Sequence, residues 1–121
     1  MKKILIVDDM STIRELVEVT LRQEDYVIFQ AENGNEALDI AKVEKPDLIL
    51  MDIMMPGEID GLEATRIIKK DIETKNCKII ILTAKGQKTD IEKGLETGAD
   101  DYFIKPFDPL DLIRKVEEIL G

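Results

Sequence analysis

The sequence contains no histidine, no tryptophan and only one cysteine, Cys77. A single cysteine cannot form a disulfide within the chain, which suits a reducing compartment such as the cytoplasm. We expect Cys77 to be a small apolar filler beside a strand. Because zinc sites in proteins rely mostly on cysteine and histidine, the sequence argues against zinc. A metal bound by this chain would be a hard cation held by oxygen atoms.

Positive charge is also scarce, since 17 Lys and Arg residues stand against 26 Asp and Glu residues, for a net charge of −9 at pH 7. This balance argues against direct binding to nucleic acid or to an anionic membrane. No apolar run approaches the ~20 residues that span a bilayer, so we expect no membrane insertion. The short apolar run near the N-terminus ends in two acids, which is not typical of a signal peptide. We expect one domain, residues 1–121.

Short apolar segments alternate with amphipathic segments along the chain. The expected strands are residues 2–7, 26–31, 48–51, 79–82 and 102–104, and the expected helices are residues 11–22, 36–43, 61–70, 88–97 and 109–120. Five strand–helix units with short links predict an α/β fold, in which helices cover both faces of a parallel sheet. Residues 48–51 are apolar throughout, which indicates a central strand buried on both faces.

Local signals mark several helix ends. Ser11 is expected to cap the first helix, whose buried face would carry Ile13, Leu16, Val17 and Leu21. The polar triplet Gln23-Glu24-Asp25 would end that helix. Gly98 is suited to follow the fourth helix, and Asp108 is suited to cap the last.

Polar side chains directly follow four of the five expected strands. These are Asp8 and Asp9 after the first, Asp52 after the third, Thr83 after the fourth and Lys105 after the fifth. A doubly wound sheet of order 2-1-3-4-5 places the first and third strands side by side at its switch point. The three carboxylates would therefore meet there and repel one another unless a cation neutralised them. Mg²⁺ fits this requirement, because it prefers oxygen ligands and binds through one or two carboxylates plus phosphate.

With a cation present, the group has the parts needed for phosphoryl transfer. The Asp52 carboxylate can attack phosphorus and form an acyl phosphate. Such transfer depends on positioning and on neutralising charge. The Lys105 ammonium and the Thr83 hydroxyl would supply part of that neutralisation.

The same residues lie in motifs that resemble the response-regulator receiver domain. The motifs are Val7-Asp8-Asp9, Met51-Asp52-Ile53-Met54-Met55-Pro56-Gly57, Leu82-Thr83-Ala84, Gly98-Ala99-Asp100-Asp101-Tyr102 and Ile104-Lys105-Pro106-Phe107. They occur in order and cover the whole chain. The resemblance implies a flavodoxin-like (βα)5 fold with the strand order known from CheY, a member of this family.

The resemblance implies a phosphoacceptor and a metal site. Asp52 would take a phosphoryl group from the phosphohistidine of a histidine kinase. Asp9, Asp52 and the backbone carbonyl of Met54 would bind Mg²⁺, or Mn²⁺ in its place, and Asp8 would act mostly through water.

The resemblance also implies a switch. Lys105 would hold the phosphoryl group, with a cis peptide bond to Pro106. Thr83 would move toward that group, and Tyr102 would rotate inward behind it. The face formed by the fourth helix, fifth strand and fifth helix would then change its affinity for a downstream protein, such as a motor, a phosphotransferase or an effector.

One stretch departs from the family pattern. The family usually has two residues between the proline after the acceptor and the following Asp/Asn-Gly pair. This chain has three, Gly57-Glu58-Ile59, before Asp60-Gly61. The extra residue lies downstream of Met54, so we expect the metal ligands to keep their places while the loop changes shape.

Other functions fit the sequence less well. A magnesium phosphatase with an aspartate nucleophile would need a second acid two residues later, where this chain has Met54. A flavin carrier would need a Ser/Thr/Gly-rich phosphate loop after the first strand. A binding-only receiver usually lacks one of the key acids. Within the switch hypothesis, in which the chain is not itself an enzyme, three roles remain open: a chemotaxis-type regulator, a phosphorelay intermediate, and part of a longer regulator. The sequence names neither the kinase, the target nor the oligomeric state.

Overall fold

The computed structural model describes residues 1–22 and 24–121. Strands and helices alternate in the order β1 (Lys2–Val7), α1 (Ser11–Leu21), β2 (Tyr26–Ala31), α2 (Gly34–Glu44), β3 (Leu48–Met51), α3 (Gly61–Lys70), β4 (Lys78–Thr83), α4 (Lys88–Glu96), β5 (Asp101–Ile104) and α5 (Pro109–Leu120). All ten expected elements are present, with bounds that shift by one or two residues. Gln23, in the expected break after the first helix, lies outside the described residues.

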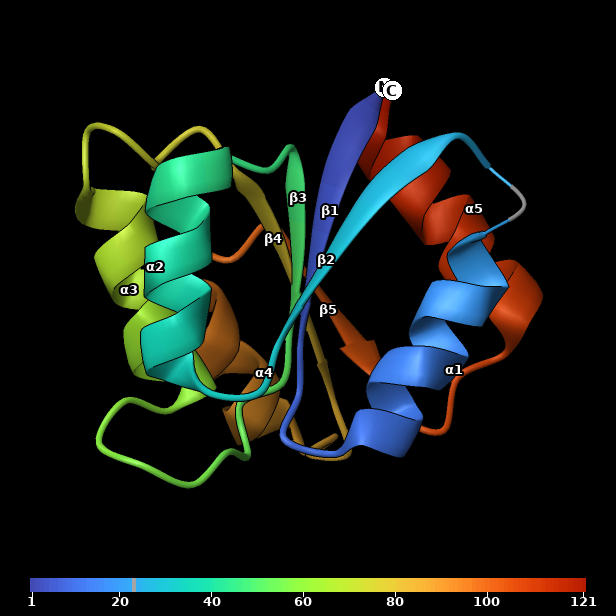
Figure 1. The fold of residues 1–121 in the computed structure, drawn as a ribbon. Coiled ribbons are helices and arrows are strands. Elements are labelled where there is room, and N and C mark those ends of the chain that lie inside the picture. The colour runs from blue at the N-terminus through green and yellow to red at the C-terminus, as the bar shows by residue number, and fades with distance from the viewer. Residues whose placement is uncertain (23) are drawn as a thin grey trace.

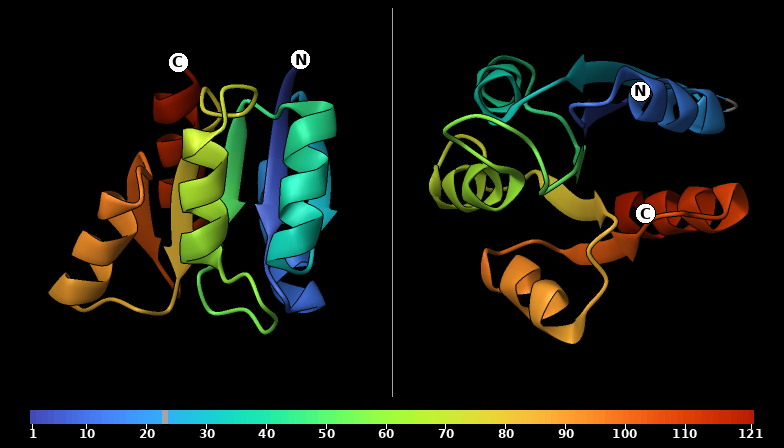
Figure 2. Two further views of the ribbon diagram at one scale, coloured as in Figure 1. Left: turned by 90° about the vertical axis from the view of Figure 1, so that its left-hand side faces the viewer. Right: turned by 90° about the horizontal axis from the view of Figure 1, so that it is seen from below.

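The strands form one parallel sheet in the order β2-β1-β3-β4-β5. The predicted doubly wound, flavodoxin-like fold is therefore confirmed. Helices α1 and α5 cover one face of the sheet, while α2, α3 and α4 lie on the other (Figures 1 and 2). The switch point of the sheet lies between β1 and β3. The loops that follow these two adjacent strands leave toward opposite faces of the sheet.

Alternate residues of the central strands build two separate cores. Side chains of Leu5, Val7, Ile49, Met51, Ile79 and Ile81 join the core under α2 and α3. Side chains of Ile4, Ile6, Leu48, Leu50, Ile80 and Leu82 join the core under α1 and α5. All four residues of β3 are buried, because both faces of a central parallel strand are covered. Cys77 is a buried filler in the first core, as predicted.

Two details of the first helix were predicted wrongly. Ser11 does not cap α1: Met10 occupies the cap position without a side-chain hydrogen bond. The Met10 N–H instead donates to Oδ1 of Asp8, at 2.9 Å. Leu16 is 50% exposed, because the covered stripe follows the i, i+4 spacing of Ile13, Val17 and Leu21 and leaves Leu16 at its edge.

Other helix ends agree with prediction. The Asp108 side chain accepts from the Leu110 N–H, with Pro109 in the first turn of α5. Gly98 follows α4 with φ of 101°, a left-handed conformation that favours glycine. Within the part of the chain that the structure describes, no helix is both long and apolar enough to cross a bilayer.

Candidate functional site

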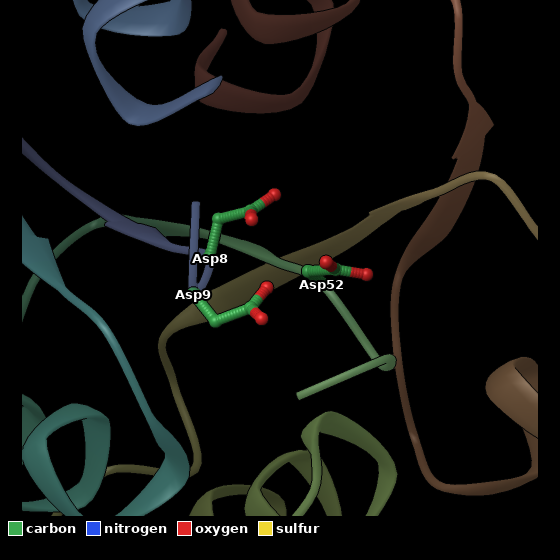
Figure 3. Close-up of side chains that lie close together, drawn as sticks. All are labelled: Asp8, Asp9 and Asp52. Atoms are coloured by element: carbon green, nitrogen blue, oxygen red, sulfur yellow. The ribbon is translucent and has the colours of Figure 1, made fainter. Parts of the chain in front are cut away.

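Three carboxylates meet at the carboxyl edge of the sheet. Asp8 and Asp9 follow β1, and Asp52 follows β3, its neighbour in the sheet. Each offers one oxygen, and these oxygens all lie within 4.8 Å of one another. Figure 3 shows the three side chains projecting from adjacent strand ends into one space. Asp8 and Asp52 are buried, whereas Asp9 is exposed. The structure thus brings together the acids that the sequence placed here.

Backbone hydrogen bonds hold the two buried acids in register. The Asp52 N–H donates to the Val7 carbonyl at 2.9 Å, and the Asp8 N–H donates to the Ala31 carbonyl at 3.1 Å. Each carboxylate also accepts from a backbone N–H two residues later, from Met10 for Asp8 and from Met54 for Asp52. Because these turns are short and local, both acids are positioned before any ligand binds.

Lys105 lies against both buried acids. Its Nζ is 2.6 Å from Asp8 Oδ2 and 3.6 Å from Asp52 Oδ2, and its side chain is 15% exposed. The Lys105 N–H donates to the Thr83 carbonyl at 2.9 Å, which ties β5 to β4 at this edge. The peptide bond to Pro106 is cis, as expected. One ammonium group therefore offsets part of the negative charge of the cluster.

The electrostatics of Asp52 show how incomplete that offset is. Burial raises the pKa of the Asp52 carboxyl, and the charge of Asp8 adds to the rise. The Met54 N–H and the Lys105 ammonium lower the pKa, but the net shift is upward. A buried carboxyl with a raised pKa is stabilised by any further positive charge placed beside it. The site is therefore suited to a cation.

Thr83 contributes a buried hydroxyl at the end of β4. The residue is fully buried, and its hydroxyl is close enough to Asp52 to lower the pKa of that carboxyl. Among the described residues, however, no group meets the full geometry of a hydrogen bond to Thr83 Oγ1. Buried hydroxyls are normally paired, so the Thr83 hydroxyl is suited to donate to a group bound beside Asp52.

Tyr102 lies on β5, outside the acid cluster. Its half-buried ring packs against Gly94 of α4, and its hydroxyl donates to the Lys85 carbonyl in the loop after β4. The ring thus joins β5 to the segment that follows Thr83. Inward rotation of Tyr102 stays a prediction.

The lengthened loop is accommodated away from the acids. Gly57 has φ of 109°, and the partly buried Ile59 side chain packs into the core against Gly34 at the start of α2. A cavity of about 430 Å³ lies between this loop and the β2–α2 turn, with Asp9 at its border. The Met54 N–H donates to Asp52 Oδ1 at 3.1 Å, so the Asp52–Met54 turn is in place beside the longer loop.

Sequence reasoning missed the role of Gly61, which it treated only as a helix start. A side chain at this position would overlap the backbone carbonyl of Asp52. The first turn of α3 therefore packs directly against the backbone of Asp52, and only glycine leaves the space. The neighbouring Asp60 caps α3 by accepting from the Glu63 N–H, and this cap was the local sequence signal that a helix begins at Gly61.

Comparison with known proteins agrees with this geometry. The family model "Response regulator receiver domain" matches residues 4–117. The phosphate regulon transcriptional regulatory protein PhoB of Pseudomonas aeruginosa is 45% identical over 119 residues, which cover 98% of this chain and 52% of PhoB. The transcriptional regulatory protein ResD of Bacillus subtilis is 46% identical over 118 residues, covering 98% and 48% of the two chains. The chain thus spans about half the length of these relatives.

A solved structure shows the same fold over its whole length. The chemotaxis protein CheY4 of Vibrio cholerae superposes with a TM-score of 0.91 at 31% identity, covering 98% of each chain. Receiver domains of this family typically bind Mg²⁺ at an acidic pocket, and the three-aspartate cluster stands at the matching edge of this sheet. From its fold, its site and these similarities, the chain belongs to the response regulator receiver domain family of two-component signalling.

Proposed function

We propose that this domain is a signalling switch that accepts a phosphoryl group on Asp52 from the phosphohistidine of a histidine kinase. The observation that carries the proposal is the placement of Lys105, 3.6 Å from Asp52 Oδ2, beside a carboxylate cluster that one ammonium cannot neutralise. An acceptor carboxylate, a cationic side chain and a metal-binding acid pair are the groups that phosphoryl transfer requires.

The donor set fits Mg²⁺, because every side-chain ligand is a carboxylate oxygen. Asp9 and Asp52 would hold the cation directly with the Met54 carbonyl, and Asp8, which forms the tighter ion pair with Lys105 at 2.6 Å, would act through water. When bound, Mg²⁺ supplies positive charge to the phosphoryl oxygens. Mn²⁺ would substitute for it.

The chain's own residues would do the following. A carboxylate oxygen of Asp52 attacks phosphorus in line with the phosphorus–nitrogen bond of phosphohistidine. A new phosphorus–oxygen bond forms, and the bonding pair of the old one returns to the imidazole nitrogen. Lys105 pairs with a phosphoryl oxygen, and the unpaired Thr83 hydroxyl donates to another. The domain keeps the phosphoryl group, so it acts as a substrate and switch and does not turn over as an enzyme.

Phosphorylation would change the face formed by α4, β5 and α5, and a downstream protein would read it. Relay of the phosphoryl group to a phosphotransferase is the alternative. PhoB and ResD are named as transcriptional regulators and are about twice as long as this chain. If this chain were part of such a longer regulator, the output function would lie in the part outside the receiver domain. With a charge of −9, the receiver itself is not expected to bind nucleic acid. We expect it to work in the cytoplasm.

Stoichiometry tests the proposal. With acetyl phosphate or phosphoramidate and Mg²⁺, wild-type protein should take up one phosphoryl group per chain and then stop, and EDTA should prevent uptake. Continuous release of phosphate over many turnovers would instead favour the magnesium phosphatase. No uptake with any small donor, while fold and Mg²⁺ binding are intact, would favour a binding-only receiver.

Thr83→Ala should separate phosphorylation from the response of the output face. The hydroxyl lies beside Asp52, whereas Tyr102 is tied to the loop after Thr83. Labelling of Asp52 should stay largely intact in the variant, while amide shifts around Tyr102 on adding beryllofluoride should shrink. Thr83→Ser, which keeps the hydroxyl, is the matched control and should respond like wild type. Equal shifts in wild type and Thr83→Ala would count against this coupling.

The acyl phosphate should be long-lived for a receiver. Hydrolysis needs a water in line with the Asp52–phosphorus bond. In the receiver family, the side chains two residues after the acceptor and two residues after the threonine flank that approach, and in this chain they would be Met54 and Lys85. Met54 is 52% exposed and Lys85 is exposed. The Met54 thioether is a weak hydrogen-bond acceptor, and the Lys85 ammonium has no acceptor atom. Neither side chain can therefore orient that water. Met54→Asn with Lys85→Glu should shorten the lifetime several-fold.

Release of radiolabelled phosphate from the purified acyl phosphate measures that lifetime. Lys88→Glu makes the same charge change at an exposed lysine of α4 and should leave the lifetime as it is. A double variant that kept its phosphate as long as wild type would show that Met54 and Lys85 point to solvent without effect.

A further inference from the structure

Arg14 reaches from the first turn of α1 back to the acid cluster. Its Nη1 donates to the backbone carbonyl of Asp8, with 2.6 Å between the two atoms. That carbonyl belongs to the peptide group that joins Asp8 to Asp9. Since a peptide group is planar, a bond that fixes its oxygen also fixes the direction in which Asp9 leaves the strand.

Asp9 has little else to hold it. Its side chain is exposed, and within residues 1–22 and 24–121 no hydrogen bond or ion pair to it is found. The contrast with Asp8 is direct, because the Met10 N–H and the Lys105 ammonium engage both oxygens of that carboxylate. The position of the Asp9 carboxylate therefore depends on the backbone on either side of it.

The guanidinium of Arg14 is itself held in place. Its Nε donates to Gln30 Oε1 of β2 at 3.0 Å, and Gln30 Nε2 donates to Glu18 Oε1 at 2.8 Å. Glu18 accepts at its other oxygen from Arg22, at 3.3 Å. A planar guanidinium can donate in two directions at once, to Gln30 and to Asp8, whereas a lysine ammonium lacks this rigid fork. The half-buried Arg14 is thus clamped between β2 and the end of β1.

We propose that Arg14 is a positioning residue for the divalent cation, which preorganises Asp9 by fixing the Asp8–Asp9 peptide group from the α1 side. The proposal rests on the proposed function, in which Asp9 is a metal ligand. Arg14 does not touch the cation. Groups that orient metal ligands typically change metal affinity about 10- to 100-fold when removed.

The sign of the effect separates positioning from charge. Arg14 carries a positive charge that repels a cation, so a purely electrostatic role predicts tighter metal binding when Arg14 is removed. Positioning predicts weaker binding. Arg14→Met keeps much of the length of the side chain and removes both the charge and the fork. Arg114→Met makes the same change at an exposed arginine of α5, outside this network, which pairs with Asp111.

Titration of the free Mn²⁺ signal in electron paramagnetic resonance measures the affinity. Arg14→Met should bind Mn²⁺ about tenfold more weakly than wild type, Arg14→Lys should fall between them, and Arg114→Met should match wild type. Melting curves in EDTA show whether each variant is folded. If Arg14→Met does not fold, Gln30→Met, which frees the guanidinium while keeping its charge, should also weaken binding.

The outcomes are distinct. Unchanged or tighter Mn²⁺ binding by folded Arg14→Met, or an equal loss in Arg114→Met, would overturn the positioning role and leave the proposed function standing. Unchanged binding by Gln30→Met would overturn it where Arg14→Met cannot be studied. Absence of Mn²⁺ binding by wild type would overturn both.

Discussion

Asp52→Asn is expected to abolish phosphorylation by acetyl phosphate or phosphoramidate in the presence of Mg²⁺. An amide cannot form the acyl phosphate that the carboxylate forms, so the expected loss is complete and not partial. The substitution nearly preserves the size of a side chain that is only 7% exposed, so the fold should be kept. Incorporation of radiolabelled phosphate, normalised to folded protein, measures the effect.

Asp39→Asn provides the matched control, because it makes the same change at an exposed acid on α2. It should label like wild type. Undiminished labelling of Asp52→Asn would refute the assignment, unless peptide mapping placed the label on Asp8 or Asp9 as a rescue site within the same cluster.

Mg²⁺ is expected to raise the melting temperature in a concentration-dependent way. Without a cation, the carboxylates of Asp8, Asp9 and Asp52 repel one another in a largely buried space. A ligand that binds only the folded state at about ten times its Kd adds about 1.4 kcal/mol of stability. In a domain of this size that corresponds to a rise of about 5 °C. Thermal melting in EDTA and in increasing Mg²⁺ measures the shift.

Asp9→Ala should lose this response. Because Asp9 is exposed and holds no partner among the described residues, the variant should be at least as stable as wild type in EDTA. Asp39→Ala, at the exposed acid on α2, should respond to Mg²⁺ like wild type. Identical melting curves for wild type in EDTA and in millimolar Mg²⁺ would remove the basis for a cation site.

The raised pKa of Asp52 adds a pH dependence to the metal-free protein. Burial makes the folded pKa of this carboxyl higher than its unfolded value. Above the folded pKa the ionised carboxylate destabilises the fold, and this cost disappears as the pH falls through that pKa. Asp52→Asn should therefore be more stable than wild type in EDTA at neutral pH, and the difference should shrink as the pH is lowered. A difference that grew at lower pH would show that the carboxylate stabilises the fold.

The fold was predictable because its signals are local and repeated. β3 is apolar at every position, which only a strand covered on both faces requires. The alternation with amphipathic helices then left few topologies open. Acids at the ends of strands β1 and β3 become neighbours through that topology alone, so the cluster of Asp8, Asp9 and Asp52 followed from it.

What the sequence missed depends on contacts between distant segments. Helical periodicity placed Leu16 on the buried face, but the neighbouring elements cover only the stripe through Val17 and Leu21. Gly61 was predicted only as the start of a helix, because its close contact with the Asp52 backbone depends on how α3 packs. The contacts of Arg14 were not predicted, since its bonds to Asp8 and Gln30 cross from α1 to the end of β1 and to β2.

Location of the phosphoryl group on the wild-type chain tests the central claim most directly. Borohydride reduces an acyl phosphate to an alcohol, which converts a phosphorylated aspartate into homoserine, and peptide mass spectrometry identifies its position. The account predicts homoserine at position 52 alone, only when Mg²⁺ is present during phosphorylation. Homoserine at any other position, with Asp52 recovered unchanged, would contradict it.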